Sequence, residues 1–205
     1  MLFLPTYFAP ISQYVALFKN DSFVFEVEDN FQKQTYRNRC YIYAANGKLL
    51  LNIPIIHNKK ERNQKTKDIR IENSFPWQKL HFKSIQSAYS SSPFFEFYQD
   101  DLMPIFEQKQ SFLLDFNLKC HEYIMNAIQE KIPYTKTSIY EKEPTLKDAR
   151  ILANAKKEHP IKLKSYVQVF DDKHGFIPNL SILDLLFMEG PNLVCYLKEQ
   201  KIILE

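Results

Sequence analysis

Residues 2–27 read LFLPTYFAPISQYVALFKNDSFVFEV, and this stretch decides the fold class that we expect. A short apolar run, Leu2–Leu4, comes first, and Pro10 then opens a helix that reaches about Lys19. A second apolar, β-rich run follows at Ser22–Val27. Strand, helix and strand within so short a span predict a small βαβ unit, in which the crossover is right-handed.

A β-hairpin is expected after this unit. The β-rich runs Cys40–Tyr43 and Leu49–Ile55 flank residues 44–48, AANGK, and Asn-Gly is the strongest short hairpin signal because both turn residues must accept a positive φ. The polar, lysine-rich segment His57–Asp68 is expected to be a loop, followed by a further strand at Ile69–Glu72.

The middle of the chain is predicted to be helical. The caps and apolar spacing indicate helices over about residues 74–90, 92–103 and 111–132, and Pro104 should kink or end the second of them. A sequence similar to a capping box at Thr145–Asp148 predicts another helix start.

The C-terminal part predicts a short strand at Tyr166–Phe170 and a helix at Leu180–Glu189, ended by Gly190. The expected class is therefore α/β, with a mixed α+β arrangement as the alternative. Its order is an N-terminal βαβ unit and β-hairpin, a helical middle, and a short strand plus helix. A length of 205 residues indicates a single domain over residues 1–205.

The composition limits the classes of function. With 27 Lys and Arg against 24 Asp and Glu, the net charge is +3. This mild basicity permits a phosphorylated substrate but argues against a nucleic-acid-binding protein, whose basic patches are stronger. The three glycines are too few for the glycine-rich loops that cradle phosphates, and no spacing typical of a metal site occurs. Cofactors and oligomeric state are left open.

The cysteines and the N-terminal segment bear on the compartment. Cys40, Cys120 and Cys195 are odd in number, far apart, and lack disulfide or zinc spacing, which predicts reduced thiols. The N-terminal segment has no basic region and no long apolar run, and no 18-residue apolar stretch occurs anywhere. We therefore expect a cytoplasmic protein without a membrane span.

The densest polar segment, residues 28–39 with the sequence EDNFQKQTYRNR, directly follows a predicted strand. In open α/β sheets, ligands bind beyond the carboxyl ends of strands. One interpretation is a substrate loop in which Arg37 and Arg39, on one face of an extended chain, bind phosphate or carboxylate while Asp29 acts as a base. The alternative is a solvated loop that leads into the hairpin.

Two further features have two interpretations each. His81 lies on the same predicted helix face as Trp77 and Ile85, so it is either a core histidine satisfied by a carbonyl or a general acid/base at a pocket edge. The basic run His57–Arg70 is either a solvated surface or an anion-binding lid.

Several segments, in this order, resemble the WbqC-like family in a form associated with the Bacteroidetes. They are residues 33–40 (KQTYRNRC), 45–47 (ANG), 53–55 (IPI), 77–82 (WQKLHF), 87–89 (SAY), 92–96 (SPFFE), 112–117 (FLLDFN) and 174–187 (HGFIPNLSILDLLF). The resemblance extends from about Leu4 to Pro191.

The resemblance implies a function in bacterial surface polysaccharide biosynthesis of the O-antigen type. A transferase role that places glycine or another amino acid on an amino sugar is suggested for the family, with a phosphorylated or nucleotide-activated sugar as partner. The alternative is a non-catalytic binding or scaffold protein of the same pathway. The site residues expected on this basis are two catalytic candidates, Asp29 and His81, and six substrate-binding candidates: Tyr7, Lys33, Tyr36, Arg37, Asn38 and Arg39.

Overall fold

The computed structural model describes residues 1–56, 63–157 and 160–202. A parallel sheet is formed by β1 (Leu2–Phe3), β2 (Phe23–Phe25) and β5 (Tyr134–Lys136), in the order β1-β2-β5. Helix α1 (Ile11–Leu17) connects β1 to β2 and confirms the predicted βαβ unit. The sequence did not predict β5, which is only three residues long and partly exposed.

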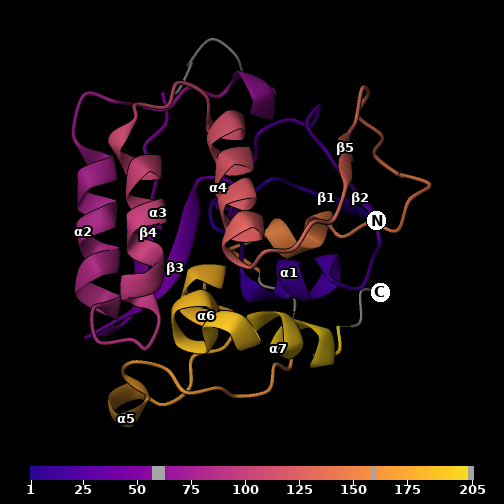
Figure 1. Cartoon of the computed structure of the whole chain (residues 1–205). Coiled ribbons are helices and arrows are strands. Elements are labelled where there is room, and N and C mark those ends of the chain that lie inside the picture. The colour runs from indigo at the N-terminus through magenta and orange to yellow at the C-terminus, as the bar shows by residue number, and fades with distance from the viewer. Residues whose placement is uncertain (57–62, 158–159, 203–205) are drawn as a thin grey trace.

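Helix α1 is buried on every side, which is why its sequence is apolar almost throughout. Figure 1 shows it at the centre of the molecule, beside α6 (Ile182–Glu189) and α7 (Leu193–Glu199). Two of its buried polar groups have partners elsewhere in the chain: the Ser12 N–H donates to Asn179 Oδ1 (3.0 Å) and the Gln13 amide donates to the Leu4 carbonyl (3.0 Å).

The predicted hairpin is confirmed, with a shifted turn. β3 (Arg39–Ala44) and β4 (Gly47–Asn52) pair antiparallel, and their closing pair is Ala44 with Gly47. The turn residues are therefore Ala45 and Asn46, and of the expected Asn-Gly pair only Gly47 has a positive φ, 94°. The strand expected at residues 69–72 is wrong, because Arg70 and Ile71 make isolated bridges to different segments.

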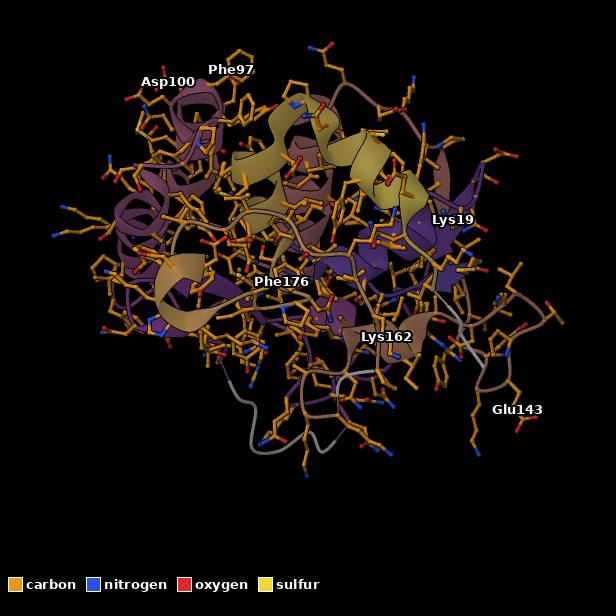
Figure 2. All side chains as sticks on the ribbon, turned by 90° about the horizontal axis from the view of Figure 1, so that it is seen from below. Lys19, Phe97, Asp100, Glu143, Lys162 and Phe176 are labelled. Atoms are coloured by element: carbon orange, nitrogen blue, oxygen red, sulfur yellow. The ribbon has the colours of Figure 1, made fainter. Side chains whose placement is uncertain are left out.

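The helical middle is confirmed by α2 (Trp77–Tyr89), α3 (Phe95–Glu107) and α4 (Leu113–Ala127). Figure 1 shows α2 and α3 side by side at the end of the molecule away from the sheet, whereas α4 lies nearer the sheet, where its His121 packs against Phe23 and Phe25 of β2. The exposed Phe97 and Asp100 project outward from α3 (Figure 2).

Of the two expected effects of Pro104, a kink or an end near Met103, the end is wrong, because α3 continues through Pro104 to Glu107. Proline leaves the carbonyl four residues earlier without its helical donor, and that residue, Asp100, is exposed to water. The final turn is stabilised by burial of Ile105 and Phe106.

The C-terminal helix α6 ends at Glu189, as expected. Gly190 has φ 47°, and a Cβ there would lie 2.6 Å from the Phe94 ring, so only glycine fits. The strand expected at Tyr166–Phe170 is wrong, because Tyr166 and Gln168 bond to a side chain of α6 rather than to a neighbouring strand.

Two other expectations from the sequence are settled by the described residues. The helix expected from Thr145 is wrong, since only a 3₁₀ turn forms, at Arg150–Ala153. Cys40, Cys120 and Cys195, all within the described ranges, are free thiols as predicted. Among the residues that the structure describes, no helix has the length and apolar character needed to cross a membrane.

Candidate functional site

The carboxyl ends of the parallel strands meet at one edge of the sheet. Leu4 follows β1, Glu26 follows β2 and Thr137 follows β5. The Thr137 hydroxyl donates to Glu26 Oε1 (2.8 Å) and accepts the N–H of Val27 (3.0 Å), so the ends of β2 and β5 are tied together. This edge is where open α/β sheets bind ligands.

A polar pocket of about 230 Å³ lies at this edge, and we call it the edge pocket. It is lined by Leu4, Asp29, Gln32, Thr35, Arg37, Tyr140, Arg150, Ile151, Ala153 and Asn154. Two of the residues predicted from sequence, Asp29 and Arg37, are therefore brought together here.

Backbone contacts from three directions position Arg37. The Tyr36 carbonyl accepts the N–H of Tyr7 (2.9 Å), and the Tyr36 N–H donates to the Ala153 carbonyl (2.8 Å). The Asn117 amide of α4 donates to the Arg37 carbonyl (2.8 Å). The segment is thus attached to the loop after β1, to the 3₁₀ turn and to α4.

The Arg37 guanidinium and Asp29 form a buried ion pair through Nη2 and Oδ2. The exposed fractions of the two side chains are 1% and 6%. Burial lowers the pKa of Arg37 below its usual value while Asp29 opposes that change, and an arginine stays protonated in either case.

The pair does not use all of its hydrogen-bonding capacity. Within the described part of the chain, Nε and Nη1 of Arg37 and Oδ1 of Asp29 are buried without a hydrogen-bond partner. A buried polar group without a partner costs about 1–3 kcal/mol, and native proteins contain few of them. The edge pocket therefore offers donors and an acceptor that a ligand or an ordered water can use.

Arg150, which sequence reasoning missed, differs from Arg37 in having its donors engaged. Its guanidinium donates to the Asp148 carboxylate (2.7–3.0 Å) and to the carbonyls of Glu141 (2.9 Å) and Lys142 (3.0 Å). The hydrogen bond to Asp148 raises the pKa of Arg150. Arg150 therefore fixes the wall of the edge pocket.

Glu26 was also missed. It is buried, and its Oε2 has no hydrogen-bond partner among the described residues, although Arg150 Nη1 lies 3.9 Å away. Its position directly after Phe25, inside an otherwise apolar strand run, is the sequence signal that marks it.

His81 does not join Asp29. Its Nδ1 is hydrogen-bonded to the Tyr7 hydroxyl (2.9 Å), it has a backbone hydrogen bond to Asn52, and burial lowers its pKa to about 4. The described residues that line the edge pocket include neither Tyr7 nor His81. The structure therefore places His81 and Tyr7 together in the core, outside the lining of the edge pocket, and their assignments as catalytic and substrate-binding residues stay predictions.

Arg37 and Arg39 are also separated. Residues 36–38 form a turn ahead of β3, so the alternation of an extended strand does not apply, and the expected common face is wrong. Arg39, Asn38 and Lys33 line a different cavity of about 390 Å³, which we call the hairpin pocket. It is lined by Phe31, Lys33, Gln34, Asn38, Arg39, Asn52, Ile53, Pro54, Ile55 and Glu72. Tyr36 is buried against Tyr41 and is among the lining residues of neither pocket as described.

A family model described as WbqC-like protein family matches residues 5–160 of the 205. The chain belongs to the WbqC-like protein family. The matched range contains every predicted site residue and the lining of both pockets except Leu4. The similar segment at 174–187 lies outside it. No curated protein and no solved structure matches the chain.

The basic run of this WbqC-like chain is described only from residue 63 onward, and residues 57–62 lie outside the described residues. Lys65 and Lys67 are largely exposed and pair with Glu28 (2.7 Å each), which lowers the pKa of Glu28. Neither lysine is among the described residues that line the two pockets. The described part of the run therefore fits a solvated surface. Among the described residues, no cluster of His, Cys, Asp and Glu is suited to a metal ion.

Proposed function

We propose that this WbqC-like protein is a transferase of bacterial surface polysaccharide biosynthesis that binds an anionic sugar in the edge pocket. The observation that carries the proposal is the buried guanidinium of Arg37. Two of its nitrogen atoms have no partner among the described residues, and it lies at the carboxyl edge of a parallel sheet. The family's association with O-antigen gene clusters supports a phosphorylated or nucleotide-activated sugar as the substrate class.

Arg37 binds the anionic group in this proposal. A guanidinium donates from two nitrogen atoms to two oxygens of a phosphate or carboxylate, and such charge-assisted bonds are about twice as strong as neutral ones. Arg150 does not compete for the ligand, because Asp148 and backbone carbonyls already accept from its guanidinium.

Asp29 is the candidate base. Its Oδ2 is engaged by Arg37, so Oδ1 is the oxygen that accepts a proton from the attacking hydroxyl or amine. Transfer of an aminoacyl or glycyl group to an amino sugar is the reaction suggested for the family. The amine of the sugar then attacks the acyl carbon of an activated aminoacyl donor, an amide bond forms, and the activating group of the donor leaves with the electron pair of the broken bond.

A non-catalytic binding or scaffold protein of the same pathway is the second candidate. It is favoured by the ion pair itself, because the Arg37 guanidinium already occupies one oxygen of the Asp29 carboxylate. Turnover separates the two candidates. For a transferase, Asp29→Asn retains binding and abolishes complementation of a deletion strain. For a scaffold, the same variant binds and complements.

Calorimetry of wild type and Arg37→Lys against a panel of sugar phosphates tests the binding site. An ammonium does not reproduce the planar fork of arginine, so we expect Arg37→Lys to bind roughly 10- to 150-fold more weakly, which corresponds to about 1.5–3 kcal/mol. Arg39→Lys is the matched control, because Arg39 lines the other pocket, and it should bind like wild type.

Melting curves of both variants accompany the titrations, so that a loss of fold is not read as a loss of binding. Equal affinities of wild type and Arg37→Lys for the sugar phosphate that binds best would remove Arg37 from the site. No binding by any member of the panel, together with full complementation by Arg37→Lys, would favour the scaffold candidate.

A further inference from the structure

The segment Phe31–Arg39 separates the two polar pockets. Gln32, Thr35 and Arg37 line the edge pocket. Phe31, Lys33, Gln34, Asn38 and Arg39 line the hairpin pocket. The two pockets, as described, share no lining residue. A small ligand in the edge pocket therefore contacts a different set of side chains from a small ligand in the hairpin pocket.

The hairpin pocket has an excess of positive charge. Its wall contains the cations Lys33 and Arg39 and the carboxylate Glu72, which accepts the N–H of Ser74 (2.8 Å). Arg39 has no ion-pair partner in the described ranges, and its Nε is buried there without a hydrogen-bond partner. The charge of Arg39 is therefore available to an anionic ligand.

Asn38 adds an unused acceptor to the same wall. Its side chain is buried, with only 6% exposed, and its amide donates to Asn52 Oδ1 (3.2 Å) and to the Ile53 carbonyl (3.1 Å). These two bonds fix the orientation of the side chain. Oδ1 of Asn38 then has no donor among the residues that the structure describes. A hydroxyl or amino group of a ligand can supply one.

The rest of the wall is mixed, with the polar side chains of Gln34 and Asn52 and four apolar residues. Phe31, Ile53, Pro54 and Ile55 contribute ring and aliphatic surface, and a cavity of about 390 Å³ falls within the usual size of small-molecule sites. A ligand that fits this wall combines a flat apolar ring, hydrogen-bonding groups and a phosphate chain. A nucleoside phosphate has all three.

We propose that the hairpin pocket is a second binding site, which takes a nucleoside diphosphate. Arg39 and Lys33 bind the phosphates, Asn38 Oδ1 accepts from a hydroxyl or amino group, and the apolar residues of the wall cover the base. The two arginines near the start of the hairpin then serve two different ligands, one on each side of the segment Phe31–Arg39. Only the further statement that these ligands are the two reactants of a transferase rests on the proposed function.

Calorimetry with UDP, GDP, CDP and ADP, and with inorganic pyrophosphate as the probe without a base, tests the assignment. We expect at least one nucleotide to bind wild type, Arg39→Lys to bind it at least about tenfold more weakly, and Arg37→Lys to bind it like wild type. Arg39→Lys should also melt like wild type, because it breaks no ion pair of the described residues.

Three results would overturn the assignment: binding of none of the four nucleotides, pyrophosphate binding as tightly as the best nucleotide, or a loss caused by Arg37→Lys instead of Arg39→Lys. The proposed function fails differently. Suppose that sugar phosphates bind wild type and Arg37→Lys equally, while nucleotide binding depends on Arg39. The edge pocket is then not the sugar site, and the hairpin pocket is still the nucleotide site.

Discussion

Two buried carboxylates, Asp184 and Asp29, lie in contrasting surroundings. Asp184 is completely enclosed, and both of its oxygens are engaged: it accepts from the hydroxyls of Tyr89 (2.6 Å) and Tyr166 (2.5 Å) and from the amide of Gln168 (2.9 Å). Asp29 has one oxygen in the ion pair with Arg37 and one without a partner in the described structure.

The difference shows how a structural polar group is told from a functional one. The bonds to Asp184 hold the segment around Tyr166 and Gln168 onto α6, and they are complete without any ligand. The pair of Asp29 and Arg37 is as deeply buried but incomplete, and it lines a pocket. Burial alone is therefore a poor guide to function, and unused hydrogen-bonding capacity beside a cavity is a better one.

Asp184→Ala should have the largest effect on stability. It leaves the hydroxyls of Tyr89 and Tyr166 buried without an acceptor, and each such group costs about 1–3 kcal/mol, or roughly 2–6 kcal/mol together. The Gln168 amide keeps the Ile177 carbonyl as an acceptor (3.0 Å). Urea unfolding at neutral pH measures the loss. Because this approaches the whole stability of a domain, Asp184→Asn, which keeps an acceptor oxygen, is the milder variant. Wild-type stability in both variants would show that the network is not structural.

Arg37→Ala should follow, with a loss of about 3–5 kcal/mol, because it leaves the Asp29 carboxylate buried without its cation. Adding Asp29→Ala should recover part of that loss, since no unpaired charge then remains. Denaturation of the two single variants and the double variant gives the coupling free energy. Additive effects would mean that the two groups do not interact in solution. The unused hydrogen-bonding capacity of the ion pair would then no longer indicate a binding site.

The pH dependence of the free energy of unfolding distinguishes a third buried group, His81, from Asp184. Burial lowers its folded-state pKa to about 4 from the usual value of about 6.5, so the unfolded chain binds more protons between these values. Its contribution to stability is present above about pH 6.5 and is lost as the pH falls toward 4, with a difference of roughly 3 kcal/mol. Asp184 acts in the opposite sense, because its folded-state pKa is raised by burial and its contribution is lost as the pH rises through that value.

Urea unfolding at several pH values between 4 and 7 checks the expectation for His81. His81→Gln should flatten the curve, and His174→Gln, at an exposed histidine, is the control variant for the replacement of a histidine as such. His121, whose pKa burial also lowers to about 4, keeps part of the slope in both variants. An unchanged curve in His81→Gln would mean that this histidine is accessible to protons in the folded state, as an acid/base catalyst must be.

Much of the fold was predictable from local patterns. Apolar runs, caps and the Asn46-Gly47 sequence gave the βαβ unit, the hairpin and the helical middle, because burial and turn geometry act locally there. The errors lie where distant contacts decide. β5 forms because Phe23–Phe25 offers an edge to pair with. Tyr166–Phe170 fails to form a strand because Asp184 accepts from its side chains.

The candidate site was predictable only as a segment. The position of residues 28–39 after a strand predicted the neighbourhood, and the structure places Asp29 and Arg37 together there. The division of Arg37 from Arg39 depends on the turn at residues 36–38, which bonds to Tyr7 and Ala153 far away in the chain. Sequence spacing does not contain those contacts, and it likewise did not exclude His81 from the site.

Glu28→Gln should have the smallest effect, and it tests whether exposure decides the energetic importance of a carboxylate. Glu28 adjoins Asp29 in sequence, but its partners Lys65 and Lys67 are 45% and 42% exposed, and exposed ion pairs contribute little and are screened by salt. These lysines lower the pKa of Glu28, so its contribution to stability is present above the usual carboxylate pKa and is lost as the pH falls through the folded-state value.

We expect Glu28→Gln to cause a small fall in Tm at low salt and none at 1 M NaCl. Glu199→Gln, which loses an ion pair with a single lysine, Lys164, is the matched control and should change Tm even less. A loss as large and as salt-resistant as that of Arg37→Ala would break the contrast, because an ion pair with exposed lysines would then stabilise the fold as much as a buried one.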